Sequence, residues 1–307
     1  MKIGIVYNPF AGKNKTKGGE RIKNLESLLN GRGILRETRS IEEIDKAAQE
    51  FHHEQIDILG ISGGDGTNNF VLSRFQKVYG EELPLLLLLK GGTMNLLESC
   101  LGMKGGPEDR LKRCIQQIDK NCLQTVPHTL LKVNDKMGYI FGNGIIANFM
   151  QEYYKGGDPG PKKALQVLMK ACCSSVTGGN YYEKLFAPIG AHVQIGDTLL
   201  PQSRFMALMA ATEKGCGLGF KPFYRARQAQ GKLHFLAINL SPFELIKNLP
   251  RFRAGKKVKN DNLFETLTDK VVINTFHPYY YTLDGEMLNS TTRIELSPGP
   301  IVKIIAV

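Results

Sequence analysis

The chain has 307 residues, which is long enough for two domains that each bury a core of their own. Lysine and arginine total 40 against 29 acidic residues, and the net charge of +11 favours anionic partners such as nucleotides, anionic lipid surfaces or nucleic acids. The longest apolar run, 85–89, is too short for a transmembrane helix, and the first residues enter a strand pattern without the apolar core of a secretory signal.

The first part of the chain alternates strand and helix patterns, which is typical of a parallel sheet flanked by helices. The expected strands are 2–7, 56–61 and 85–89, and the expected helices have apolar faces at 22–29, 41–51, 71–79 and 111–118. Ligands of such sheets bind at the carboxyl ends of the strands. The loops after residues 7, 61 and 89 are therefore expected to converge on one site.

A glycine turn with a carboxylate inside it follows the expected strand 56–61. Its sequence is Gly63-Gly64-Asp65-Gly66-Thr67-Asn68-Asn69. Glycines can turn their backbone N–H groups toward one concavity, where these donors and the start of a helix stabilise phosphate oxygens. An ordinary tight turn is the alternative, but the strand–turn–helix order and Asp65 favour a nucleotide phosphate site. Thr67 or Asn68 is expected to cap the following helix.

From about residue 125 the pattern changes to short strands broken by turn residues, which is typical of an antiparallel sandwich or barrel. The expected strands are 130–133, 139–141, 193–195, 205–209, 233–238, 271–275, 279–283, 294–296 and 302–305. Two helices are expected to interrupt them. One begins at Pro161, and the other begins at Ser241, which can form a capping box with Glu244.

Four segments occur in a characteristic order along the chain. They are Asn8-Pro9-Phe10-Ala11-Gly12, Gly63–Thr67, Gly92-Thr93-Met94-Asn95 and Asp284-Gly285-Glu286. Together they resemble the catalytic-domain family of bacterial diacylglycerol kinases and sphingosine kinases, and the resemblance extends over nearly the whole chain. It implies an α/β plus β fold, with a Rossmann-like, NAD kinase-like nucleotide-binding domain at 1–125 and an antiparallel β-sandwich lipid-substrate domain at 126–307. The active site is expected in the cleft between them.

Members of this family transfer the γ-phosphoryl group of ATP to a lipid hydroxyl, so the resemblance implies ATP and Mg²⁺ as cofactors and a diacylglycerol-like or sphingoid acceptor. In phosphoryl transfer the protein mainly positions the phosphates and neutralises their charge. The residues expected to contact the nucleotide are Asn8, Pro9, Gly12, Thr38, Gly63, Gly64, Asp65, Gly66, Thr67, Asn68, Asn69, Thr93 and Asn95. Thr38 is included because it matches a family threonine.

Two acidic groups are the candidates for catalysis. Asp65, with Asp284, is expected to hold Mg²⁺, which prefers oxygen ligands and commonly takes one or two carboxylates. Glu286, or else Asp284, is expected to be the general base that takes the proton of the lipid hydroxyl. The reverse assignment, with Asp65 as the base, stays open. Asp284-Gly285 is also a strong hairpin-turn signal, and both interpretations can hold.

Three positions depart from the family's pattern. Leu96 stands where many members have an acidic residue, and Phe70 stands where a glutamate is common. Members with a structural Mg²⁺ site have an Asp-Gly turn where this chain has Gln230-Gly231, and a neutral Gln230 beside Lys232 is a poor ligand for a hard cation. We therefore expect this second metal site to be missing or altered.

The acyl chain of a lipid needs an apolar cleft. Its expected lining is Ile145, Ile146, Phe149, Met150, Leu165, Leu168 and Met169, although core packing explains each of these equally well. The basic segment Arg251–Lys259 is expected to contact an anionic membrane leaflet, since each nearby Lys or Arg contributes about 1 kcal/mol.

These features predict a cytoplasmic protein at the inner face of the membrane. The six cysteines contain no C-x-x-C pair and are expected to be reduced core residues. The expected partner is a lipid substrate at the membrane surface, and no nucleic acid is expected. A homodimer is one option for the assembly.

Three other functions stay open. NAD kinases share the Gly63–Thr67 motif, although the separate Asn-Glu motif of those enzymes is missing here. A catalytically silent nucleotide- or lipid-binding module is consistent with the missing carboxylates at Leu96 and Gln230. A nucleic-acid-binding protein is suggested by the net charge alone.

Overall fold

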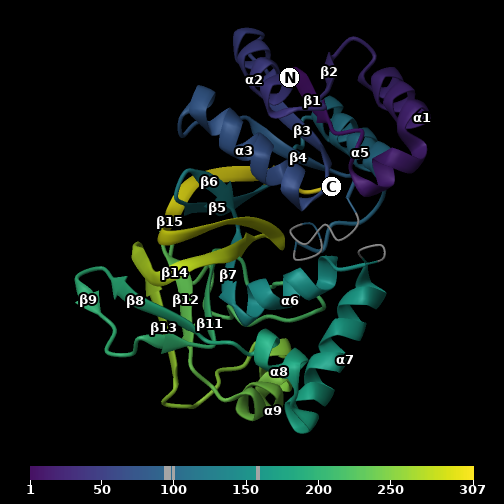
Figure 1. Cartoon of the computed structure of the whole chain (residues 1–307). Coiled ribbons are helices and arrows are strands. Elements are labelled where there is room, and N and C mark those ends of the chain that lie inside the picture. Colours follow the sequence, from purple (N-terminus) through teal and green to yellow (C-terminus); the bar gives the residue numbers. More distant parts are fainter. Residues whose placement is uncertain (93–97, 99–100, 157–159) are drawn as a thin grey trace. The chain divides into compact units, whose positions relative to one another are not determined.

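The structure is a computed structural model that describes residues 1–92, 98, 101–156 and 160–307 (Figure 1). The chain divides into two compact units. The first comprises Met1–Leu130 and Pro300–Val307, and the second comprises Leu131–Gly299. All residues after 125 were expected in the second domain, whereas Pro300–Val307 packs with the first unit.

A parallel sheet forms the centre of the first unit. In spatial order its strands are the end of β15 (Glu286–Ile305), β4 (Leu85–Lys90), β3 (Ile58–Gly63), β1 (Ile3–Tyr7) and β2 (Gly33–Glu37). Ile3 pairs with Ile58 on one side and with Gly33 on the other. At the far edge Ile304 pairs in parallel with Leu86. The segment 302–305 is the end of the long strand β15, as expected, and it additionally pairs in parallel with β4 of the first unit.

Helices cover both faces of this sheet. They are α1 (Gly12–Leu29), α2 (Ile41–His53), α3 (Asp65–Tyr79) and α5 (Pro107–Asp119), and α1 packs with α5 as α2 packs with α3 (Figure 1). On one face Ile3 and Ile5 join the apolar cluster that contains Leu25 of α1. On the other face a Cβ at Gly4 would lie 2.6 Å from the ring of Phe51 on α2. The alternation of side chains along β1 explains this division.

Antiparallel strands form the second unit. In spatial order they are β13 (Leu263–Thr268), β12 (Leu233–Ile238), β11 (Ala207–Ala211), β7 (Ile140–Gly144), β14 (Val271–Leu283) and β15. β8 (Ile189–Ile195) also pairs with β14 and holds β9 (Thr198–Leu199) and β10 (Arg204–Phe205), while β5 (Thr125–Val133) pairs with β6 (Lys136–Gly138). The expected antiparallel strands are present, but a separate β-sandwich is not confirmed. Alternating apolar residues identify strands without determining into how many sheets they assemble.

Four helices interrupt these strands in the described part of the second unit. They are α6 (Ile145–Tyr154), α7 (Pro161–Thr177), α8 (Asn180–Leu185) and α9 (Pro242–Arg253). Of these, α7 and α9 were expected from the sequence, whereas α6 and α8 were not. The expected capping box of α9 is confirmed, because Oγ of Ser241 accepts from N of Glu244 at 3.3 Å and Oε2 of Glu244 accepts from N of Ser241 at 2.9 Å.

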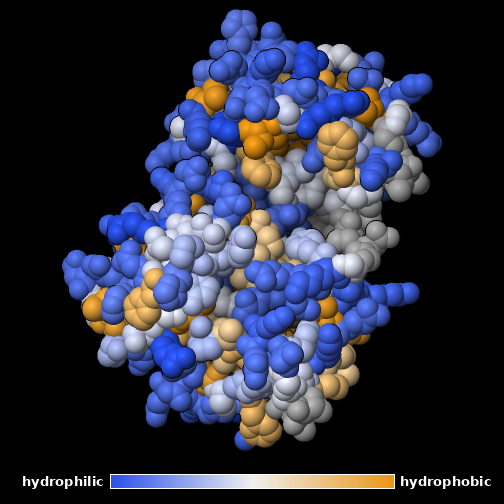
Figure 2. All heavy atoms as spheres, in the orientation of Figure 1, coloured by the Kyte–Doolittle hydropathy of each residue, from blue (hydrophilic) through white to orange (hydrophobic). Residues whose placement is uncertain are grey.

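Hydrophilic residues cover most of the molecular face drawn in Figure 2, and hydrophobic residues lie between them in small groups. The most exposed large apolar side chains include Phe10 at 63% and Phe243 at 67%. No helix within the described ranges has the length and apolar character needed to cross a membrane.

Candidate functional site

The ends of β1, β3 and β4 lie together at one edge of the parallel sheet. The backbone N–H of Asn8 donates to the carbonyl of Ser62 at 2.9 Å, and that of Gly91 donates to the carbonyl of Gly63, also at 2.9 Å. Parallel strands present their carboxyl ends at the same edge, so the loops that follow them converge here.

Asn14 of α1 is a fully buried amide beneath these loops. Its Nδ2 donates to the carbonyls of Asn8 at 2.9 Å and of Ser62 at 3.0 Å. Its Oδ1 accepts from Nη1 of Arg21 at 2.9 Å. A Cβ at Gly91 would come within 2.7 Å of Nδ2 of Asn14, so the third loop can approach this amide only because residue 91 is a glycine.

Asn14 and Arg21 were not among the residues expected at this site. Both precede the buried Leu25 at helical spacing, so they lie on the face of α1 that packs against the sheet. Arg21 also donates from Nε to Oε1 of Glu108 at 3.3 Å. A polar pair on the apolar face of a predicted helix was the signal that could have identified them.

The glycine turn leads from β3 directly into α3. Gly64 is the N-cap residue and α3 begins at Asp65, so the expected capping by Thr67 or Asn68 is wrong, because both residues lie inside the first turn. Gly64 has no side chain that could cap the first turn of α3. The N–H groups at a helix start carry a partial positive charge and are suited to an anion.

Two glycines of this turn are required by close approaches. A Cβ at Gly63 would lie 2.3 Å from Cβ of Thr67, and a Cβ at Gly64 would lie 3.2 Å from Cα of Gly92. The first distance is far below a van der Waals contact, so a side chain at residue 63 would displace the start of α3.

The first turn of α3 carries four buried polar side chains, those of Asp65, Thr67, Asn68 and Asn69. Oγ1 of Thr67 accepts from Nδ2 of Asn8 at 2.8 Å. Within the described residues, neither polar atom of the Asn68 amide has a hydrogen-bond partner. A buried amide without a partner is unfavourable, and amide and carboxylate groups suit phosphates and Mg²⁺. The residues present therefore fit a nucleotide with its metal, and Asp65 and Asn68 are the groups that would hold them.

The other residues expected at the nucleotide lie at the same edge or outside the described chain. Thr38 is buried and donates its N–H to the end of β1 at 2.8 Å, Pro9 is half-buried, and Gly12 is the first residue of α1. Thr93 and Asn95 lie outside the described residues.

Asp284 and Gly285 form a two-residue hairpin turn between β14 and β15. Their φ angles are 52° and 86°, and Leu283 pairs with Glu286 across the turn. Positive φ at both central residues is the type I′ geometry that favours Asp-Gly. The hairpin interpretation of this motif is confirmed, and Glu286 is half-buried at the start of β15.

The Asp284 carboxylate links this turn to β7. Its Oδ1 accepts from the backbone N–H of Tyr139 at 3.0 Å and of Ile140 at 2.8 Å, and the residue is only 4% exposed. Burial, and then the negative charge of Asp284, raise the pKa of the Tyr139 hydroxyl well above its usual value. Asp284 therefore has a structural role in the second unit, whatever its role in catalysis.

The seven residues expected to line a lipid cleft differ in their environments. Ile145 and Phe149 on α6 pack against a buried cluster that includes Met206. Leu165 and Met169 on α7 are 54% and 57% exposed. The remaining three, Ile146, Met150 and Leu168, are half-buried.

Gln230 lies in the turn before β12, where Gly231 has a φ of 69°. The neighbouring Lys232 ammonium pairs with the Asp269 carboxylate at 2.5 Å. The described ranges contain no group of three or more His, Cys, Asp or Glu residues that could hold a metal ion. The loss of the structural Mg²⁺ site stays a prediction.

The cysteines are less uniformly buried than expected. Cys114 is buried, whereas Cys122 and Cys173 are exposed. Burial raises the pKa of the Cys114 thiol to about 11, so this residue stays protonated.

Residues 2–126 match the sequence model of the diacylglycerol kinase catalytic domain. No curated protein matches the chain.

Three solved structures from Bacillus anthracis strain Sterne resemble the chain. One is named as a diacylglycerol kinase, and the other two are named as "putative" diacylglycerol kinases. Their TM-scores are 0.70, 0.65 and 0.69 at 18%, 19% and 19% identity, and each match covers 100% of this chain and 97% of the other. At this identity the likeness shows a shared mixed α/β fold.

Proposed function

Residues 2–126 belong to the diacylglycerol kinase catalytic domain family, and from this we propose that the chain is an ATP-dependent lipid kinase. It would transfer the γ-phosphoryl group to the hydroxyl of a diacylglycerol-like or sphingoid lipid. The observation that carries the proposal is the uncapped start of α3 within the matched segment, where the Asp65 carboxylate and the Asn68 amide are buried.

In this proposal the phosphates bind to the loops after β1 and β3. Backbone N–H groups at the start of α3 and the amides of Asn8 and Asn68 donate to phosphate oxygens, and Asp65 holds Mg²⁺. The bound nucleotide and its metal supply the phosphoryl group and neutralise its charge. The hydrogen bonds of Asn14 fix the loops before binding, so the donors need little reorganisation.

Glu286 is the proposed general base that takes the proton of the lipid hydroxyl. Asp284 accepts two backbone hydrogen bonds, from Tyr139 and Ile140, and thereby fixes the hairpin that orients Glu286. The engagement of the Asp284 carboxylate with the backbone of β7 is the reason for preferring Glu286 over Asp284 as the base.

The test is ADP release with labelled ATP, Mg²⁺ and a panel of acceptors: diacylglycerol, a long-chain base, ceramide, a polyprenol and NAD. We expect release that depends on one lipid. Asp65→Asn and Glu286→Gln should each lower kcat/KM by about 100-fold or more, because each removes a charge or a base used in the transfer. The matched controls Asp119→Asn and Glu295→Gln change exposed carboxylates and should leave kcat/KM nearly unchanged.

Two other outcomes would contradict the lipid kinase proposal. ADP release that depends on NAD and on none of the lipids would indicate an NAD kinase-like enzyme. Nucleotide binding without turnover on any acceptor would indicate a silent binding module, which the structural engagement of Asp284 makes the second candidate.

We further propose that the enzyme reaches its lipid through the basic segment Arg251–Lys259 at the end of α9, where the basic side chains are exposed and Val258 is buried. Sedimentation with vesicles should increase with their anionic lipid content and fall in an Arg251→Gln/Lys256→Gln variant. Sedimentation that is independent of anionic lipid would contradict this contact.

A further inference from the structure

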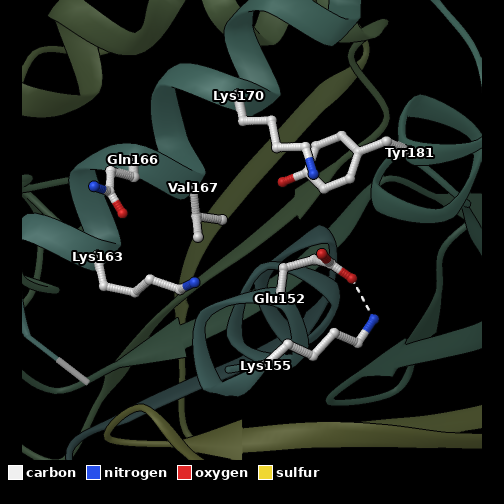
Figure 3. A pocket seen from close by; sticks show the side chains of 7 residues that line it. All are labelled: Glu152, Lys155, Lys163, Gln166, Val167, Lys170 and Tyr181. Atoms are coloured by element: carbon white, nitrogen blue, oxygen red, sulfur yellow. Dashed lines mark hydrogen bonds and ion pairs between the residues drawn. The ribbon is translucent and has the colours of Figure 1, made fainter. Parts of the chain in front are cut away.

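A cavity of about 330 Å³ lies among α6, α7 and α8 of the second unit (Figure 3). Three lysines line it, Lys155 from the end of α6 and Lys163 and Lys170 from α7. The volume is at the lower end of the range for ligand pockets, roughly 300–1,000 Å³, so a small ligand fits better than a nucleotide. We call this cavity the lysine pocket.

The lysine pocket has an excess of positive charge. Its three lysines face one acid, Glu152, which forms an ion pair with Lys155. No carboxylate in the described part of the chain pairs with Lys163, and Lys170 lies over the ring of Tyr181 with Nζ 3.9 Å from the ring centroid. Figure 3 shows these side chains extending around one space. Among the described residues, two ammonium groups of the pocket therefore have no acid that neutralises them.

Tyr181 adds a hydroxyl donor to the same wall of the pocket. Its oxygen is buried and has no hydrogen-bond partner among the described residues. Burial, and then the charge of Glu152, raise the pKa of this hydroxyl, so it keeps its proton and can donate. A buried donor without an acceptor, beside unpaired ammonium groups, indicates an anionic oxygen ligand.

We propose that the lysine pocket binds a phosphomonoester. Such a group carries a charge of about −1.5 to −2 at neutral pH, which matches the two unpaired ammonium groups, and it has three acceptor oxygens for Lys163, Lys170 and Tyr181. A carboxylate has fewer oxygens and about half this charge. Val167 is the one aliphatic side chain among the described residues that line the pocket, so we expect the part of the ligand beyond its phosphate to be mostly polar.

The pocket is connected to the hairpin of Glu286 through α6. Tyr154, between the pocket residues Glu152 and Lys155, donates its hydroxyl to the carbonyl of Gly285 at 3.2 Å. A ligand that orders the end of α6 would therefore also act on this hairpin. The phosphomonoester has two sources with the same chemistry, a soluble phosphate compound or the headgroup of a phosphatidate-type lipid.

The soluble arm of the test measures binding of inorganic phosphate and glycerol 3-phosphate to the full chain by calorimetry. We expect saturable binding that falls at least tenfold in Lys163→Gln/Lys170→Gln. Lys162→Gln removes a neighbouring exposed charge outside the pocket and should bind like the unmodified chain. Asp65→Asn should also bind normally, so failure of the kinase proposal and failure of this one are distinguishable.

The lipid arm compares vesicles that contain phosphatidate with vesicles of equal charge that contain phosphatidylglycerol. A preference for phosphatidate that Lys163→Gln/Lys170→Gln abolishes would identify the lipid headgroup as the source. Binding of the soluble compounds without that preference would identify a soluble ligand. Absence of saturable binding in both arms, or equal binding by the double variant with an unchanged circular dichroism spectrum, would overturn the proposal.

Discussion

At the scale of single residues, the candidate nucleotide site depends on Asn14, which is not among the residues expected to contact the nucleotide. Asn14 joins the ends of β1 and β3 through its amide donors and anchors Arg21 through its acceptor. Because the amide is fully buried, each bond lost on truncation leaves a buried group without its partner.

The Asn14→Ala variant should lose about 2 kcal/mol of unfolding free energy, since several buried hydrogen bonds are broken at once. Urea denaturation measures this loss. Asn24→Ala, an exposed asparagine on the same helix, should change stability by less than about 0.5 kcal/mol. Equal effects of the two substitutions would show that the amide of Asn14 contributes nothing specific.

His234 is a second buried residue with a measurable consequence. It is fully buried between Phe223 and Tyr224, and Nε2 lies 3.6 Å from Oε2 of Glu265. Burial lowers its pKa to about 4, although Glu265 acts in the opposite direction and Arg225 acts with burial. The imidazole is therefore neutral in the folded protein at neutral pH, despite its acidic neighbour.

This shift predicts a pH dependence of stability. The unfolded chain takes up the His234 proton near pH 6.5 and the folded chain only near pH 4, so the contribution is complete above pH 6.5 and is lost as the pH falls toward 4. Between pH 7 and pH 5 this residue should account for about 2 kcal/mol of lost unfolding free energy. The unfolding free energy of His234→Phe, measured by urea denaturation at pH 7 and at pH 5, should lack this part of the pH dependence. The variant His192→Gln, which changes an exposed histidine, should retain it.

At the scale of elements, the β3–α3 turn shows why its glycines are needed. Gly63 and Gly64 let the start of α3 lie against the loop after β4, and Asp65 then begins the helix without a side-chain cap. The functional carboxylate and the uncapped N–H groups share one turn. A small displacement of α3 would therefore alter both together.

Gly63→Ala should weaken nucleotide binding by about tenfold or more, because its Cβ would overlap the Thr67 side chain at 2.3 Å and overpacking of this kind costs about 1–3 kcal/mol. Binding of a labelled ATP analogue measures the change. Gly19→Ala in α1 is the matched control, since among the described residues no atom beyond its chain neighbours and its own helix backbone lies within 4 Å of its Cβ position. That substitution should raise stability by about 0.5–1 kcal/mol and leave nucleotide binding unchanged.

At the scale of the whole molecule, the proposed chemistry requires residues from both units. Asp65 belongs to the first unit, and Asp284 and Glu286 belong to the second. Each unit has its own buried core, and two chain segments, β5 and β15, continue from one unit into the other.

The Asp65→Asn/Glu286→Gln double variant tests whether the two acids act in one reaction. Substitutions of groups that act as a unit have strongly non-additive effects on kcat/KM. The double variant should therefore lose little more kcat/KM than the more impaired single variant. Steady-state ADP release measures all three. Losses that multiply would mean that the two acids contribute independently, against the proposed shared phosphoryl transfer.

The sequence by itself identified the alternating strands and helices of the first unit, the strand–turn–helix around Asp65, the hairpin at Asp284-Gly285 and the capping box of α9. These features depend on neighbours within a few residues, because periodicity, glycine conformations and caps are local properties of the chain.

Only the tertiary structure decided that Asn14 lies buried beneath three loops, that Pro300–Val307 packs with the first unit, and that Asp284 binds the backbone of β7. It also brought together the lysine pocket from α6, α7 and α8, of which only the start of α7 was expected from the sequence. Strand pairing and the burial of polar groups depend on partners tens or hundreds of residues away, and no local pattern encodes which partner is chosen.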